Sequence, residues 1–200
     1  MSKISYEFQN IHLLIKLAHI EPLIWRRIIV PSFITLLNLH EVIQVVMDWT
    51  RSHKHEFMID GITYGTPDQG AWGSQSRVLA EGDVRLHEVI NEKDLMFTYT
   101  YDFGDNWVHE IVVEKILESE SGRSEAQCLR GKRSCPPEDV GGPYSYPEFL
   151  KAIADPSHAD HDHLLEWVGD EFDPEAFKLG RINEQLEFMA EYWEIPKNFG

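Results

Sequence analysis

Three histidines and two aspartates have the types and the spacing to form a chemical site. They are His53, His55, His109, Asp102 and Asp105. Imidazole and carboxylate groups that share a dry cleft can bind a metal ion or exchange protons with a substrate. The alternative is that each histidine is a core residue bonded to a Tyr hydroxyl or a main-chain carbonyl, and that the aspartates only shape a turn.

A predicted β-hairpin decides which of these side chains point together. Strands at 95–101 and 107–117 flank the connection Asp102-Phe-Gly-Asp-Asn106. The expected cross-strand pairs are Tyr101 with Trp107, Tyr99 with His109, and Phe97 with Ile111. Because strand side chains alternate in direction, His109 shares a face with the aromatic residues. A strand at 53–60 likewise places both of its histidines beside Phe57. We therefore expect the three imidazoles to converge with the aromatic rings.

The two cysteines form a second candidate site. Cys128 and Cys135 are separated by six residues, a wider spacing than in a zinc knuckle. Between them lie the basic residues Arg130, Lys132 and Arg133. Nearby cations stabilise a thiolate, which favours metal binding or reactivity. The candidate zinc ligands are Cys128, Cys135, His53, His55 and His109. Two inert buried thiols and a redox pair remain as alternatives.

Charge and composition narrow the classes of function. The net charge of −16 opposes direct binding to nucleic acid, except locally at Arg26-Arg27 and at 130–133. Two cysteines in 200 residues make no disulfide framework, and neither a signal peptide nor a membrane span is evident, so we expect a cytoplasmic protein. The sequence also contains none of the familiar phosphate-loop, dinucleotide, serine-hydrolase or zinc-protease motifs.

Strands come first along the chain and helices later. Strands are expected at 11–17 and 24–30, around a turn at Glu21-Pro22, and a helix capped by Thr35 is expected over Leu36 to Trp49. A short helix follows Asp83 and ends near Ile90. This order predicts an α+β fold: a mainly antiparallel sheet with a helix packed on it and a C-terminal helical lobe.

We predict one domain over residues 1–200. It comprises a strand-rich part at 1–117, a connecting loop at 118–145 and a helical part at 146–193. In the helical part, Ser145-x-x-Glu148 is a capping box, and Ser157 caps a helix through Trp167. Asp173-Pro174 opens a helix that runs toward Trp193.

Five blocks of sequence together resemble one known family. They are Pro22-Leu-Ile-Trp-Arg-Arg27; Leu39-His-Glu with Trp49-x3-His53-x-His-Glu-Phe57; Tyr99-Thr-Tyr-Asp-Phe-Gly-Asp-Asn-Trp-Val-His-Glu-Ile111; Cys128-x2-Gly-Lys-Arg-x-Cys-Pro-Pro-Glu-Asp-Val-Gly-Gly142; and Asp173-Pro-Glu-Ala-Phe177. The chain is similar over about 11–186 to the plasmid pRi ORF-three-like family of bacteria and archaea. The resemblance implies a single α+β domain without an established activity or cofactor. Relatives often carry a third cysteine where Val140 stands, which counts against a cysteine-bound zinc in this chain.

We interpret the shared residues as the walls of one cleft. The candidate ligand-binding residues are Trp25, Arg26, Arg27, His53, His55, Tyr99, Tyr101, Asp102, Asp105, Trp107, His109, Glu138 and Asp139. In this interpretation the aromatic rings stack on the ligand and the two arginines anchor an anion. The first hypothesis is a binding module for a peptide or small anionic ligand. The second is a metal-assisted hydrolase or nuclease-like enzyme. The third is an accessory protein in mobile-element or DNA transactions, acting through a protein partner.

Overall fold

An eight-stranded sheet forms the centre of the computed structural model, which describes residues 9–67, 78–90, 92–118, 125–169 and 172–190. Its strand order is β5-β4-β3-β6-β7-β1-β2-β8, and every pairing except β4 with β5 is antiparallel. The strands are β1 (Gln9–Leu17), β2 (Trp25–Pro31), β3 (His55–Ile59), β4 (Ile62–Gly65), β5 (Leu79–Ala80), β6 (Met96–Tyr101), β7 (Trp107–Glu118) and β8 (Gln127–Lys132).

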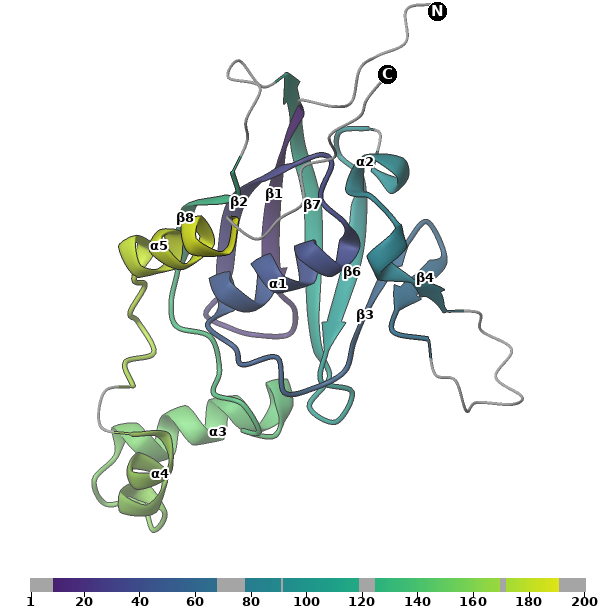
Figure 1. Cartoon of the computed structure of the whole chain (residues 1–200). Helices are drawn as coiled ribbons and strands as arrows, with labels where there is room; N and C mark the ends of the chain where they lie inside the picture. The colour runs from purple at the N-terminus through teal and green to yellow at the C-terminus, as the bar shows by residue number, and fades with distance from the viewer. Residues whose placement is uncertain (1–8, 68–77, 91, 119–124, 170–171, 191–200) are drawn as a thin grey trace, which may run out of the picture.

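Helices cover one face and one end of this sheet (Figure 1). They are α1 (Leu36–Met47), α2 (Leu86–Val89), α3 (Gly142–Ala154), α4 (His161–Val168) and α5 (Leu179–Ala190). Helix α1 lies across the sheet, α5 contacts both α1 and β8, and α3 packs on α4 at the lower end. The predicted α+β class is confirmed. Within the described part of the chain, every helix is too short or too polar to span a bilayer.

The predicted hairpin is confirmed in its register. Tyr101 pairs with Trp107, Tyr99 with His109, and Phe97 with Ile111. All six of these side chains are buried, whereas Thr98, Thr100 and Glu110 on the opposite face are not. The inward side chains form one core with α1, whose buried positions recur at helical spacing. The alternation of the sequence therefore identified the buried face of the sheet.

Helix α1 begins and ends close to where its sequence predicts. The Thr35 hydroxyl accepts a hydrogen bond from the Asn38 amide at 3.1 Å, which satisfies one of the free N–H groups of the first turn. At the other end Asp48 takes a left-handed conformation with φ of 62°. The chain then turns toward Trp49 and His53, so the end of α1 delivers these residues to the lower edge of the sheet.

Several predicted boundaries in the second half were wrong. The segment 118–145 is not only a connection, since it contains strand β8 paired with β2. Helix α3 starts at Gly142 with Gly141 as its cap, so Ser145 lies inside the helix. Helix α4 starts after Asp160, and α5 starts at Leu179 rather than at Pro174. Each predicted cap has the right residue type, but tertiary contacts determine where these helices begin. The part of the last helix predicted beyond 190 lies outside the described residues.

Candidate functional site

Three segments meet at the lower edge of the sheet and bring an imidazole against three carboxylates. They are the residues before β3, the β6–β7 connection, and the loop before α3. Nε2 of His53 lies 3.7 Å from Oδ2 of Asp102, 3.5 Å from Oε2 of Glu138 and 3.3 Å from Oδ1 of Asp139. Ligand atoms of His53, Asp102 and Asp139 all lie within 4.8 Å of one another. We call His53, Asp102, Glu138 and Asp139 the His53 cluster.

The central nitrogen of the His53 cluster is buried but unsatisfied. Nε2 of His53 has no hydrogen-bond partner among the residues that the structure describes, because the contacts to the carboxylates lack hydrogen-bond geometry. The side chains of Asp102 and Glu138 are 10% and 19% exposed, whereas that of Asp139 is 73% exposed. The cluster is thus closed on one side and open to solvent on the other.

Unusual backbone conformations place the carboxylates. Asp102 and Asp139 have φ values of 55° and 61°, and Asn106 and Arg51 have 58° and 64°. The left-handed region is disfavoured for residues with a Cβ, although Asp and Asn tolerate it best. Such conformations persist only where surrounding contacts hold them, and they gather at functional sites. The positions flanking His53 fit this pattern.

A close backbone approach docks the loop before α3 on the hairpin tip. The Gly141 amide donates to Oδ2 of Asp105 at 3.0 Å. A Cβ at Gly142, which has φ of 80°, would lie only 2.4 Å from the carbonyl oxygen of Asp105. Only glycine fits there. Asp105, predicted as a site residue, therefore positions Glu138 and Asp139 and does not itself face His53.

Glu138 is fixed by donors on its far side. Its Oε1 accepts hydrogen bonds from the Thr50 amide at 2.8 Å, the Thr50 hydroxyl at 3.0 Å and the Tyr101 hydroxyl at 3.0 Å. Burial and the adjacent Glu138 carboxylate raise the pKa of Tyr101 well above its ordinary value. The phenol therefore stays protonated at neutral pH and lies within hydrogen-bond distance of both carboxylate oxygens, at 3.2 Å from Oε2, the oxygen nearest His53.

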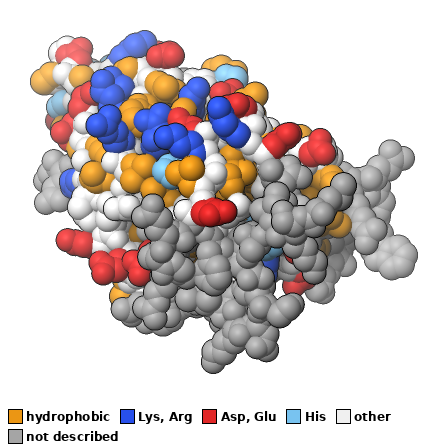
Figure 2. Space-filling view, turned by 90° about the horizontal axis from the view of Figure 1, so that it is seen from above, with side chains coloured by type: hydrophobic (Ala, Val, Ile, Leu, Met, Phe, Trp, Pro, Cys, Tyr) orange, Lys and Arg blue, Asp and Glu red, His pale blue; other side chains and the backbone are white. Residues whose placement is uncertain are grey.

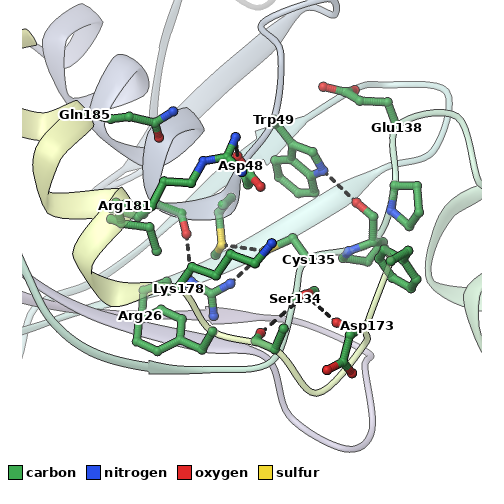
Figure 3. A pocket seen from close by; sticks show the side chains of 18 of the residues that line it. Arg26, Asp48, Trp49, Ser134, Cys135, Glu138, Asp173, Lys178, Arg181 and Gln185 are labelled. Atoms are coloured by element: carbon green, nitrogen blue, oxygen red, sulfur yellow. Dashed lines mark hydrogen bonds and ion pairs between the residues drawn. The ribbon is translucent and has the colours of Figure 1, made fainter. Parts of the chain in front are cut away.

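A cleft of about 240 Å³ adjoins the cluster at Glu138 (Figure 3). One wall is the segment Ser134–Glu138 with Trp49, and the opposite wall carries Lys178, just before α5, and Arg181 in the first turn of α5. The indole of Trp49 donates to the carbonyl of Pro136 at 2.9 Å and so fixes the near wall. The cleft thus combines an aromatic ring with two cationic side chains, although Asp48 and Asp173 also line it.

Comparisons with known proteins agree with this fold. Residues 9–181 match the family model of the plasmid pRiA4b ORF-3-like protein. The chain belongs to this family. It is 39% identical over 184 residues to the uncharacterized protein y4hQ of Sinorhizobium fredii. This alignment covers 92% of this chain and 93% of y4hQ. The crystal structure of a protein of unknown function from Methanosarcina mazei, MM3350, is similar with a TM-score of 0.76 at 36% identity; the match covers 86% of this chain and 97% of that one.

In this member of the ORF-3-like family the three predicted histidines do not converge. Nε2 of His55 lies 2.7 Å from Oε2 of Glu81, and its ring stacks on that of His40 at 3.5 Å. Nδ1 of His40 lies 2.7 Å from the Tyr99 hydroxyl, so these residues form a separate buried network beneath α1. The expected strand at 53–60 begins only at His55, so His53 lies before β3 at the edge of the sheet, whereas His55 points into the core.

His109 is a core residue, as in the alternative in which each histidine is bonded to a Tyr hydroxyl or a main-chain carbonyl. It is fully buried between Tyr99 and the edge of Trp49, and its Nδ1 lies 3.1 Å from the Tyr99 carbonyl oxygen. Its Nε2 is buried without a hydrogen-bond partner among the described residues. Burial lowers the pKa of His109 to about 4, and burial next to His55 lowers that of His40 to about 3.

This burial makes stability fall in acid. The unfolded chain protonates His109 near pH 6.5, whereas the folded chain resists protonation until about pH 4. The contribution of neutral His109 is complete above pH 6.5 and is lost as the pH falls through this interval, by about 3 kcal/mol for this residue. We expect urea unfolding to show that wild type loses stability relative to His109→Leu between pH 7 and 4.5. A difference that stays constant with pH would contradict this assignment.

The cysteines do not join the histidines. Both are free and buried. Sγ of Cys135 accepts a hydrogen bond from Arg26 at 3.3 Å and lies 3.1 Å from Sδ of Met47. Burial raises the pKa of both thiols to about 11 in spite of the nearby Arg26. The expectation that basic neighbours would stabilise a thiolate was wrong, and Cys128 and Cys135 fit the alternative of inert core thiols.

Arg26 and Arg27 lie on opposite faces of β2 and do not form an anion anchor together. All five N–H donors of the buried Arg26 are used within the protein. Their acceptors are the carbonyls of Val46, Trp25, Lys132 and Arg133 and the thiol of Cys135. Arg27 faces away from α1 and makes two hydrogen bonds to Glu114, at 2.7 and 2.8 Å.

The remaining predicted residues divide in the same way. Trp107 and Tyr99 are buried in the core, and Tyr101 touches the cluster through a hydrogen bond to Glu138 and an edge-to-face contact with the His53 ring. Trp25 lies on the open face of the sheet beside Arg27. The sequence reasoning missed Thr50, which holds Glu138, and the cations Lys178 and Arg181. No local pattern identifies these residues, because each reaches the site from a distant segment.

Proposed function

We propose that this domain binds one divalent transition-metal ion in the His53 cluster and uses the ion to hold an anionic ligand. The spacing of the donor atoms carries the proposal. Atoms that each lie about 2.1 Å from a tetrahedral ion lie about 3.4 Å from one another. The contacts of His53 to Asp102 and Asp139 are 3.7 and 3.3 Å, and the ligand atoms of these three residues all lie within 4.8 Å of one another. An ion placed among them would also satisfy the unpartnered imidazole nitrogen.

The donor set indicates which metals fit. One imidazole and two carboxylates form a mixed nitrogen and oxygen donor set. Such a set suits Zn²⁺ or Mn²⁺ better than Ca²⁺ or Mg²⁺, which prefer oxygen ligands alone. The hydrogen bonds from Thr50 and Tyr101 to Glu138 orient a carboxylate beside the ligands, as groups around metal ligands commonly do. Because Asp139 is 73% exposed, the ion would keep a coordination position open on the solvent side.

An anionic ligand follows from the surrounding charges. A chain with a net charge of −16 repels anions over most of its surface, and a bound divalent ion would supply a concentrated positive charge at one point. Lys178 and Arg181 add cations to the adjoining cleft, where Arg181 also lies 3.8 Å from the Asp48 carboxylate. A carboxylate or phosphate on a small ligand or peptide is the group that this arrangement supports.

Metal analysis tests the proposal. Protein purified without a His tag, treated with chelator and then dialysed against Zn²⁺ or Mn²⁺, is expected to retain about one ion per chain and to melt at a higher temperature than the metal-free form. Retention of less than about 0.2 ion per chain at micromolar free metal, with melting unchanged, would contradict it.

Metal-assisted hydrolysis is a second candidate, and the position of Glu138 favours it. This carboxylate is held by Thr50 and Tyr101 with its Oε2 3.5 Å from Nε2 of His53, where it could take a proton from a water bound to the ion. We expect the Zn²⁺- or Mn²⁺-loaded protein to hydrolyse bis-p-nitrophenyl phosphate, and Glu138→Gln to lose at least about 100-fold in rate while still binding metal. Absence of turnover in the loaded protein would leave the binding function alone.

A further inference from the structure

Two basic segments of this acidic chain, Arg26-Arg27 and 130–133, lie side by side in the fold. Strand β2 pairs with β8 so that Trp25 lies opposite Lys132 and Arg27 opposite Arg130. On the other side of β2, Lys16 of β1 lies opposite Trp25. Residues opposite one another in an antiparallel pair project from the same face with Cβ atoms about 5 Å apart. These residues therefore form one surface, which we call the basic sheet face: Lys16, Trp25, Arg27, Arg130 and Lys132.

The basic sheet face points away from the helices. The neighbouring positions on β2 and β8, Arg26 and Gly131, point into the core, where a Cβ at Gly131 would lie 2.8 Å from the Arg26 side chain. Arg130 and Lys132 are exposed, and none of the described helices crosses this side of the sheet (Figure 1). A view from above likewise shows Lys and Arg side chains gathered among hydrophobic ones on one side of the molecule (Figure 2).

The local charge is opposite in sign to that of the whole chain. Acidic strand residues on this face are Glu114, which pairs with Arg27, Glu110, which lies opposite Lys16, and Glu56 of β3, which lies opposite Thr100. Lys115 adds a further cation next to His12. Five Lys or Arg side chains thus share this side of the sheet with three strand carboxylates, in a chain whose net charge is −16. Physiological salt screens exposed charges beyond about 8 Å, so a ligand on this face experiences mainly the local cations.

We propose that the basic sheet face binds single-stranded nucleic acid. The Trp25 ring is half-buried, with the Arg27 guanidinium carbon 5.5 Å from its centre, and it lies between Lys16 and Lys132 on the neighbouring strands. A flat sheet with an aromatic ring among cations offers stacking to a base and charge to the phosphates on either side. An acidic peptide would match the cations but would not need an indole ring among them.

The test is fluorescence anisotropy with labelled 12-nucleotide oligothymidylate and oligouridylate. If Lys16, Arg130 and Lys132 each contact one phosphate, affinity should fall about 20-fold between 50 and 200 mM salt. Arg130→Glu/Lys132→Glu is expected to weaken binding at least about 10-fold, and Trp25→Leu about 5-fold or more. The matched control Lys93→Glu/Lys151→Glu changes net charge equally at exposed sites elsewhere and should alter binding less than about 2-fold.

Three results would overturn this proposal. One is oligonucleotide binding that Arg130→Glu/Lys132→Glu leaves unchanged, or that both double variants weaken equally. The second is no binding of either oligonucleotide at low salt. The third is tighter binding of a polyglutamate peptide to the same face, which would assign it to an acidic protein partner. Retention of metal by the sheet-face variants separates this test from that of the His53 cluster.

Discussion

Replacing His53 by Gln is expected to weaken Zn²⁺ binding at least about 100-fold, because it removes the only nitrogen donor of the cluster. Asp139→Asn should have a comparable effect, since it replaces a charged ligand by a neutral one. Asn accepts the left-handed conformation at position 139, where φ is 61°, so the loop is expected to keep its shape. Competition against a chromophoric chelator measures both affinities.

Asp60→Asn is the matched control for the backbone. Asp60 lies in the turn between β3 and β4 with φ of 49°, and it belongs to no ligand cluster among the described residues. Its variant should bind Zn²⁺ as wild type does. If His53→Gln, Asp139→Asn and Asp60→Asn all bound the ion with wild-type affinity, the site would lie elsewhere or be absent.

Arg26→Met is expected to destabilise the fold by about 4 kcal/mol, whereas Arg27→Met should cost about 1 kcal/mol or less. Removing the buried guanidinium leaves four main-chain carbonyls without their donor, three of them on or next to β2 and β8. Arg27 is 34% exposed and its pair with Glu114 is partly solvated, so the same substitution removes little. Urea unfolding of the two variants measures the difference.

The sequence interpretation, in contrast, implies that both arginines can be replaced with little loss of stability. Equal and small effects of the two substitutions would restore that interpretation and would contradict a structural role for Arg26. A large effect at both positions would show that Arg27 is anchored more firmly than its exposure indicates.

Local patterns predicted the part of the site that depends on strand alternation. The period of two between 97 and 113 identified the inward face, and the length of the connection fixed its register. The same reasoning placed His109 correctly on the apolar face. It could not show that His109 is buried beneath Trp49 and cannot contact Asp102. The burial of His109 depends on how α1 and Trp49 pack on the sheet, and these residues come from another part of the chain.

Long-range contacts explain most of what the sequence could not show. Strand β8 lies in a segment rich in Gly and charged residues, and only its pairing with β2 makes it a strand. Three of the four carbonyls that hold Arg26 come from distant segments: Val46 of α1 and Lys132 and Arg133 at the end of β8. The adjacent Arg26 and Arg27 therefore resemble an anion-binding site in the sequence, although Arg26 is a buried structural residue.

The candidate site was predicted in its residues and not in its grouping. His53, Asp102, Glu138 and Asp139 were all candidates, but they were combined with His55, His109 and the cysteines. Their actual grouping requires that the loop before α3 dock on the hairpin tip through Gly142 and Asp105. That contact joins positions far apart in the chain and leaves no periodic signal.

Anomalous X-ray diffraction at the zinc absorption edge, from crystals grown with one equivalent of Zn²⁺, tests the central proposal most directly. The structure predicts a single strong peak about 2.0–2.2 Å from Nε2 of His53 and from carboxylate oxygens of Asp102 and Asp139. A peak on other side chains, or no peak above the noise while the four residues remain well ordered, would contradict it.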